Sequence, residues 1–195
     1  MLELVGLLVL GGYLVGSIPF GFILSRLAGL GDIRKVGSGN FGATNVLRTG
    51  RRDIALATLV LDGAKGAAVV LCVDRFGNQE LSLIAGAAAV LGHCTSIWML
   101  GRGGKGVATG LGVFGAWAWP IGLACCASWL VTAYLTRRSS LAALVAFGVA
   151  PVLMLVFERR EMAAFTVLVS LMVIVRHHGN IRRLLAGTEP RIGAS

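Results

Sequence analysis

A polar, glycine-rich segment between two apolar stretches holds the first residues suited to binding an anion. It reads Lys-Val-Gly-Ser-Gly-Asn-Phe-Gly-Ala-Thr-Asn-Val-Leu-Arg over positions 35–48. Its glycines permit tight turns that expose backbone amides, and the guanidinium fork of Arg48 suits a phosphate. An ordinary interhelical loop would leave this density of donors unexplained. We therefore predict a phosphate-binding loop, with these candidate residues: Gly37, Ser38, Gly39, Asn40, Thr44, Asn45 and Arg48.

A second glycine-rich segment, 101–109, directly precedes another apolar stretch and reads Gly-Arg-Gly-Gly-Lys-Gly-Val-Ala-Thr. The backbone amides of a glycine loop at a helix N-terminus form an anion site, and Lys105 adds positive charge. The spacing does not fit a nucleotide P-loop, and no β-α-β pattern surrounds it. We predict a second phosphate-binding loop, with these candidate residues: Gly103, Gly104, Lys105, Gly106 and Thr109.

Two further polar clusters follow apolar stretches later in the chain. Segment 175–189 begins with Val175, Arg176 and two histidines and includes Asn180, while Ser139 and Ser140 follow a pair of arginines. The histidines are also consistent with simple interfacial residues. The arginines of the tail are consistent with contacts to anionic lipid headgroups.

Three ionisable residues interrupt apolar segments. Asp62 and Lys65 lie within 54–73 and are spaced three apart, so they share a helical face and can pair. Such residues are functional candidates by default, but a structural ion pair explains them equally well. His93 follows an apolar run, where a lone histidine is more often an interhelical hydrogen-bonding contact than a catalyst. We expect structural roles for all three.

The composition shows which elements must position these residues. Apolar residues make up 56% of the chain and charged residues only 14%, which is typical of a membrane protein. Segment 4–24 has 21 residues without a charge, and about 20 suffice to cross the hydrocarbon core as a helix. A cleaved signal peptide is the alternative for this segment. Its start lacks basic residues, so we expect a retained helix.

The net charge of +9 gathers in four segments: 31–53, 101–110, 137–138 and 176–191. The positive-inside rule places all four on the cytoplasmic side. The loops at 74–80 and 158–161 carry no basic excess and are expected outside. This pattern predicts an outside N-terminus and a cytoplasmic C-terminus.

The uncharged segment 111–136 decides the number of crossings. Its 26 residues join two segments expected on the same side, so they must cross twice, with a turn near Trp117–Pro120. One long crossing is the alternative, but it would place the basic tail outside. We therefore predict an all-α polytopic membrane protein with residues 1–195 in a single domain. The expected short helices number seven: 4–27, 54–73, 81–100, 108–119, 120–136, 141–157 and 162–176.

Taken together, these motifs resemble the bacterial acyl-phosphate:glycerol-3-phosphate acyltransferases of the PlsY type, nearly end to end. The matching segments are 37–48, Asp62 with Lys65-Gly66, 91–93, 103–109, 139–141, 176–181, Arg183-Leu184 and 187–189. One departure is Cys94-Thr95-Ser96, where the family usually has an aromatic–proline pair; it affects the shape of that helix end rather than the chemistry. The resemblance implies a seven-helix, multi-pass enzyme of the bacterial inner membrane with its active site on the cytoplasmic face.

The resemblance also implies the reaction, in which a fatty acyl group passes from acyl phosphate to the sn-1 hydroxyl of glycerol 3-phosphate. The products are lysophosphatidic acid and phosphate. Catalysis or binding falls to Ser38, Arg48, Lys105 with its glycine loop, Ser140, His177 and Asn180, while Glu189 is structural. Either His177 or a substrate phosphate accepts the proton. The expected partners are the two substrates and membrane lipid, with no nucleic acid, metal or cofactor, and the protein is expected to be a monomer.

Two other classes of protein share some of these features. A transporter or channel for a phosphorylated anion would also have basic loops, but its site usually lies near the midplane between repeats. A purely structural lipid-binding protein would leave the donors of the first loop unexplained. The His-x-x-x-x-Asp motif of acyl-CoA-dependent enzymes is missing after His93, His177 and His178, which favours acyl phosphate as the donor.

Overall fold

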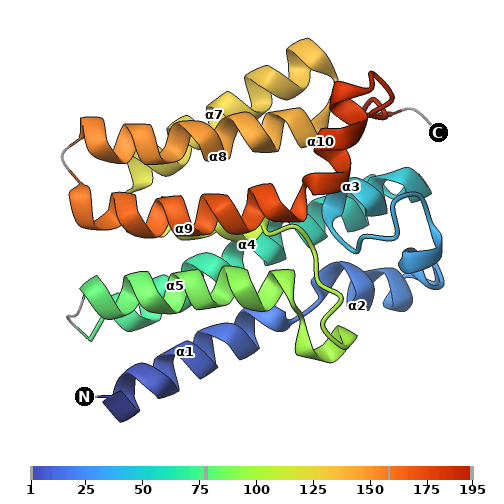
Figure 1. Ribbon diagram of the computed structural model, residues 1–195. Helices are drawn as coiled ribbons and strands as arrows, with labels where there is room; N and C mark the ends of the chain where they lie inside the picture. Colours follow the sequence, from blue (N-terminus) through green and yellow to red (C-terminus); the bar gives the residue numbers. More distant parts are fainter. Residues whose placement is uncertain (1, 77–78, 158, 194–195) are drawn as a thin grey trace.

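The computed structural model describes residues 2–76, 79–157 and 159–193, and every regular element in these ranges is helical. The longer helices run side by side, and short helices and loops gather at one end of the bundle (Figure 1). The α-helices are α1 (Leu2–Ser17), α2 (Phe20–Leu27), α3 (Ala43–Val46), α4 (Arg52–Asp74), α5 (Gln79–Cys94), α6 (Val107–Trp117), α7 (Trp119–Thr136), α8 (Ser139–Val156), α9 (Arg160–Arg176) and α10 (His178–Leu185). Three 3₁₀ turns join them: η1 (Ile33–Lys35), η2 (Leu47–Thr49) and η3 (Ile97–Met99).

Five helical segments are long and apolar enough to cross a membrane, and they contain α1–α2, α4, α5, α7 and α8. The pair α9 and α10, bent by 64°, makes a sixth, and α6 is a shorter apolar helix. The described residues confirm the predicted all-α membrane fold. The two termini lie at opposite ends of the bundle (Figure 1). The count of seven crossings and the orientation stay predictions; in the loops expected outside, residues 77, 78 and 158 lie beyond the described residues.

The break between the fourth and fifth predicted helices is confirmed. Trp117 ends α6, and Ala118 adopts an extended conformation with φ −152° and ψ 92° before α7 begins at Trp119. Pro120 then occupies the first turn of α7, where a missing backbone N–H costs nothing. The segment 111–136 is therefore two helices rather than one long crossing.

The helix predicted over 81–100 is wrong at its C-terminal end, because α5 stops at Cys94. The residues that follow bind α1 instead of continuing the helix. The Tyr13 hydroxyl donates to the Thr95 carbonyl (2.8 Å), and the Ser96 hydroxyl donates to the Ser17 carbonyl (2.6 Å). The chain then reverses at Leu100, whose φ is 54°. The short helix α10 was not predicted, because its charged sequence was interpreted as a basic tail.

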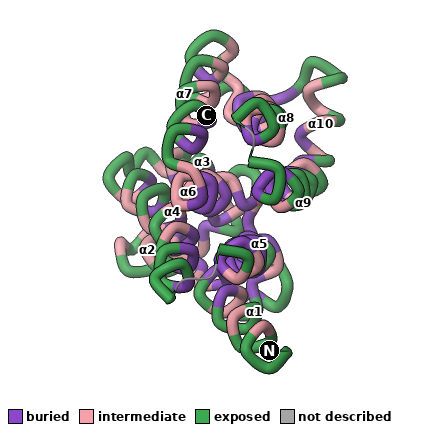
Figure 2. The backbone as a smooth tube through the Cα atoms, turned by 90° about the vertical axis from the view of Figure 1, so that its left-hand side faces the viewer, coloured by how far each residue is buried: buried purple, intermediate pink, exposed green. Residues whose placement is uncertain are grey.

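The core lies between α5, α6, α8 and α9, around Phe114, Phe147 and Val169. The buried positions concentrate where these helices face one another (Figure 2). α6 also packs closely on α4. The two helices approach so closely at Gly66 that a Cβ there would overlap the carbonyl of Thr109. Small residues permit such close approach between membrane helices. This contact fixes the N-terminus of α6, and with it the end of the glycine loop at 101–106.

Candidate active site

The first loop, 35–48, is shaped by the side chain of Asn45. Its Oδ1 accepts from the backbone N–H of Ser38 (3.0 Å) and from the Ser38 hydroxyl (3.3 Å). Its Nδ2 donates to the carbonyls of Ile33 (3.2 Å) and Val36 (3.0 Å). Asn45 is buried. The amide predicted to bind substrate therefore holds the loop in shape, and the Ser38 hydroxyl next to it is exposed.

Arg48 lies across Gly37 in the same loop. Gly37 has a φ of 52°, and a Cβ there would overlap Arg48 atoms and approach Asn45 Oδ1 to 2.6 Å. Within the described ranges, the guanidinium of Arg48 forms no hydrogen bond or ion pair, and its side chain is exposed. Thr44 is exposed as well. The loop thus presents an exposed, forked cation at the end of the bundle where the short helices and loops gather (Figure 1).

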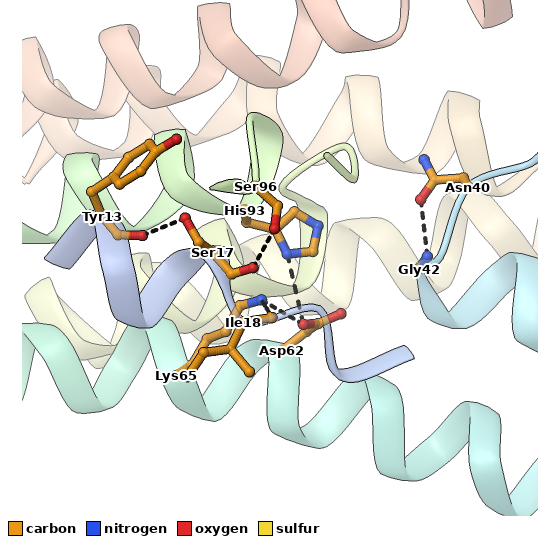
Figure 3. A network of polar contacts seen from close by, with 9 residues as sticks. All are labelled: Tyr13, Ser17, Ile18, Asn40, Gly42, Asp62, Lys65, His93 and Ser96. Carbon is orange, nitrogen blue, oxygen red and sulfur yellow. Dashed lines mark hydrogen bonds and ion pairs between the residues drawn. The ribbon is translucent and has the colours of Figure 1, made fainter. Parts of the chain in front are cut away.

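Two other predicted residues of the first loop serve its turns. Asn40 Oδ1 accepts from the backbone N–H of Gly42 (2.9 Å), as Figure 3 shows. Gly39 has a φ of 69°, a conformation that residues with a Cβ rarely adopt. Both residues therefore fix the backbone that presents Ser38 and Arg48.

The glycine loop, 101–106, is held by residues from two distant helices. The N–H of Gly104 donates to the His93 carbonyl at the end of α5 (2.8 Å). Arg176, at the end of α9, donates through Nε to the Gly104 carbonyl (3.1 Å) and through Nη2 to the Gly103 carbonyl (2.9 Å). Gly106 then caps α6 with a φ of 81°. The carbonyls of Gly103 and Gly104 are thus turned towards Arg176.

Thr109 lies apart from the other predicted residues of this loop. It is fully buried in the first turn of α6 and faces Gly66 of α4. Its position is that of a packing residue between the two helices.

Lys105 belongs to a hydrogen-bonded chain that links the glycine loop to the C-terminal segment. Its Nζ donates to Asn180 Oδ1 (2.6 Å), and Asn180 Nδ2 donates to Glu189 Oε1 (2.6 Å). The Ser140 hydroxyl reaches the same oxygen (2.7 Å), while Arg183 Nε donates to Glu189 Oε2 (2.7 Å). Side chains from α8, α10, the tail and the loop therefore meet at one place.

The electrostatics of this cluster favour an anion. Burial lowers the pKa of Lys105 to about 8; Glu189 opposes this shift, and nearby arginines, including Arg48, add to it. Burial pushes the pKa of Glu189 upwards, but hydrogen bonds from Ser140, Asn180 and Arg183 outweigh it and the pKa is lowered. Glu189 is thus a carboxylate that fixes its donors. The crowded cations would gain from a phosphate between them.

His177 is buried at the junction of α9 and α10, next to this cluster. Its Nδ1 lies 2.7 Å from the Val173 carbonyl. A carbonyl only accepts, so Nδ1 carries the hydrogen and Nε2 keeps its lone pair. Burial lowers the pKa of His177 to about 4; the bond to Val173 opposes the shift and Lys105 adds to it. The ring is therefore neutral near pH 7, and its Nε2 is an acceptor.

The predicted pairing of Asp62 with Lys65 is confirmed (Figure 3). Lys65 Nζ donates to Asp62 Oδ1 (2.7 Å) and to the Ile18 carbonyl (2.7 Å), and both side chains are almost fully buried. Because the helix breaks at Pro19, the Ile18 carbonyl lacks its usual helical partner and accepts instead from the Phe20 N–H (3.2 Å) and from Lys65. These are the contacts of a structural pair.

Arg176 and Arg183 were not among the predicted site residues. Both lie in matching motifs, but nothing in the sequence indicates that Arg176 would hold carbonyls more than 70 positions away. A basic residue directly before the two histidines was the only available signal.

A family model described as glycerol-3-phosphate acyltransferase matches residues 6–187. The chain belongs to this family. The glycerol-3-phosphate acyltransferase of Paramagnetospirillum magneticum is 55% identical over 193 residues, covering 99% of this chain and 96% of the relative. That of Rhodospirillum rubrum is 54% identical over 197 residues, covering 97% and 91%.

Solved structures show the same fold. The crystal structure of PlsY, an integral membrane glycerol 3-phosphate acyltransferase, in its glycerol 3-phosphate form has a TM-score of 0.92 at 35% identity and covers 97% of this chain and 96% of its own. The lysophosphatidic acid form has a TM-score of 0.90 at 34% identity, with 97% and 95% covered. The predicted family and the integral membrane fold are thus confirmed.

Proposed function

We propose that this chain transfers a fatty acyl group from acyl phosphate to the sn-1 hydroxyl of glycerol 3-phosphate. The observation that carries the proposal is the proximity of the two cations, since Arg48 of the first loop acts electrostatically on Lys105 of the second, and Lys105 acts in turn on the neutral His177. Both substrates carry phosphate, so two anion sites are needed, and the chain supplies two loops. Membership of the glycerol-3-phosphate acyltransferase family supports the acceptor.

The reaction requires little of the protein beyond the positioning of the two substrates. The sn-1 oxygen attacks the acyl carbon, the bond from that carbon to the phosphate oxygen breaks, and phosphate leaves. Acyl phosphate is a mixed anhydride with a good leaving group, so proximity and charge stabilisation supply most of the catalysis. The hydroxyl proton passes to Nε2 of His177 or to a substrate phosphate. Arg48, Lys105 and the α6 N-terminus hold the phosphates.

The remaining residues fall into supporting roles in this proposal. Ser38 and Ser140 contribute hydroxyls, and Asn180 orients the Lys105 ammonium. Glu189 fixes Asn180 and Ser140, while Asp62, Lys65 and His93 are structural. We further propose one membrane domain over 1–195 with seven crossings, a monomeric state and a cytoplasmic active site in the bacterial inner membrane. The acyl chain remains in the lipid or in a groove between helices.

Purified protein in detergent, given acyl phosphate and labelled glycerol 3-phosphate, tests the reaction. We expect labelled lysophosphatidic acid and one phosphate per product, and no product when acyl-CoA replaces acyl phosphate. Flux of glycerol 3-phosphate into liposomes without acylated product would instead indicate a transporter and end the proposal.

Labelling from each side of the membrane tests the topology. Cysteines placed singly at positions 51 and 102, in a background without the native cysteines, should react only with reagent on the cytoplasmic side. Reaction of these positions from opposite sides would separate the two loops and contradict a shared site.

A further inference from the structure

The ring of His93 lies between the two loops and contacts both. On one side, its centroid is 5.6 Å from that of Phe41 in the first loop, with the planes tilted by 59°. On the other side it lies against Gly104, where an added Cβ would overlap the imidazole. The His93 carbonyl also accepts from the Gly104 N–H (2.8 Å). One residue at the end of α5 thus contacts two segments that lie about 60 positions apart in sequence.

The third edge of the ring faces α4. His93 Nδ1 lies 3.6 Å from Asp62 Oδ1, and Figure 3 shows the imidazole directed towards the Asp62–Lys65 pair. His93 is only 4% exposed. α4 therefore faces the Nδ1 edge of the ring, while Gly104 of the glycine loop lies against its Nε2 edge and Phe41 of the first loop contacts the ring as well.

We propose that His93 is a positioning residue that sets the separation of the two phosphate-binding loops. The proposal rests on the proposed function, in which each loop holds one substrate phosphate. Each loop can bind its phosphate without the other, but the attack of the hydroxyl on the acyl carbon depends on their spacing. A misplacement of about 1 Å can cost about 100-fold in rate. Removal of the His93 ring should therefore lower kcat while changing the KM of each substrate little.

Substitutions at position 93 separate the ring from its polar contact. His93→Phe keeps an aromatic wedge and loses the contact to Asp62, while His93→Asn keeps a polar hydrogen near Asp62 and loses the ring. We expect His93→Ala and His93→Asn to lower kcat by about 100-fold, with each KM within about threefold, and His93→Phe to retain most of kcat. A rise in KM alone, or a better Asn than Phe variant, would overturn the proposal.

The contact with Gly104 provides a second, independent test. In the otherwise unchanged protein, Gly104→Ala forces its methyl group against the imidazole and should lower kcat. In the His93→Ala background the methyl group has room, so the same change should cost far less. Equal costs in both backgrounds would show that the contact does not set the loop position. If His93→Ala fails to fold, His93→Asn, which also lacks the ring, replaces it in the same cycle.

Amide hydrogen exchange tests whether the His93 ring holds the two loops, without relying on turnover. In the substrate-free protein, His93→Ala should speed amide exchange in 36–42 and 100–106 together, while α8 is unchanged. Protection retained in both loops would contradict the proposal even where the wild-type enzyme is active. If instead the wild type makes no acylated product, the proposed function fails, while this exchange result still decides whether His93 holds the loops.

Discussion

The two candidate phosphate-binding loops are built in opposite ways. The hydrogen bonds that shape the first loop are mostly local, because the Asn45 side chain bonds to residues that lie 7 to 12 positions before it. The glycine loop is held from outside, by Arg176 and Asn180, which lie 72 to 75 positions away. Arg48 in the first loop is exposed and unpaired within the described ranges, whereas Lys105 in the second is half-buried and bonded.

This difference shows where the precision of the site comes from. A locally held loop can adopt its shape before the rest of the bundle packs, and its free cation can follow a substrate. The externally held loop acquires its geometry only when α5, α9 and α10 are in place. We infer that the first loop can adjust to a substrate as it binds, whereas the glycine loop holds its substrate in a fixed position.

The largest expected effect is the loss of either cation. Arg48→Ala and Lys105→Ala should each lower kcat/KM by at least about 100-fold, because the phosphate charge loses its partner. Steady-state kinetics with both substrates measures this, and melting in detergent serves as the folding control. Arg48→Lys is the matched variant that keeps charge and loses the fork. Unchanged kinetics in the alanine variants would remove these residues from phosphate binding.

Removal of the His177 ring is expected to be nearly as severe. His177→Ala should lower kcat by about 100-fold if Nε2 accepts the hydroxyl proton. His178→Ala is the matched control, because this neighbour is exposed and should change kcat little. An effect confined to the KM of glycerol 3-phosphate would make His177 a binding residue and leave the substrate phosphate as the base.

An intermediate effect should follow from loosening one loop at a time. Asn45→Ala removes the internal bonds of the first loop, and Arg176→Met removes the external bonds of the glycine loop. Each should raise one KM by about tenfold, because about 1.4 kcal/mol of ordering is lost. Under the proposal that each loop holds one phosphate, the two variants should affect different substrates and thereby show which loop binds which substrate. If both raise the same KM, the two-loop arrangement is wrong.

The smallest effect is a pH dependence that only the buried cation should show. The pKa of Lys105 is lowered to about 8, so its ammonium is lost as pH rises through that value. The KM of the substrate held by Lys105 should therefore increase about threefold between pH 7.5 and 8.5. Lys105→Arg should flatten the profile, because a guanidinium stays protonated. A profile that is identical in both proteins would assign the titration to another group.

The sequence predicted the parts of the site that depend on residue type. Gly37 and Arg48 were predicted to bind phosphate because a turn glycine exposes backbone amides and a guanidinium suits an anion. In the structure, Arg48 lies across Gly37. The pairing of Asp62 with Lys65 followed from helical periodicity alone. The structure adds that the Asn45 amide bonds to the backbone of its own loop, which composition does not reveal; its role in substrate binding stays a prediction.

By itself, the sequence determined that the chain forms apolar helices, because backbone groups in lipid must be satisfied within each segment. It also determined the chemical character of the two loops. Only the tertiary structure decided that α5 ends at Cys94, that Arg176 holds the glycine loop, and that His177 keeps its Nε2 lone pair. The first two depend on contacts between distant segments, and the third on how the junction of α9 and α10 folds, and no local pattern encodes these.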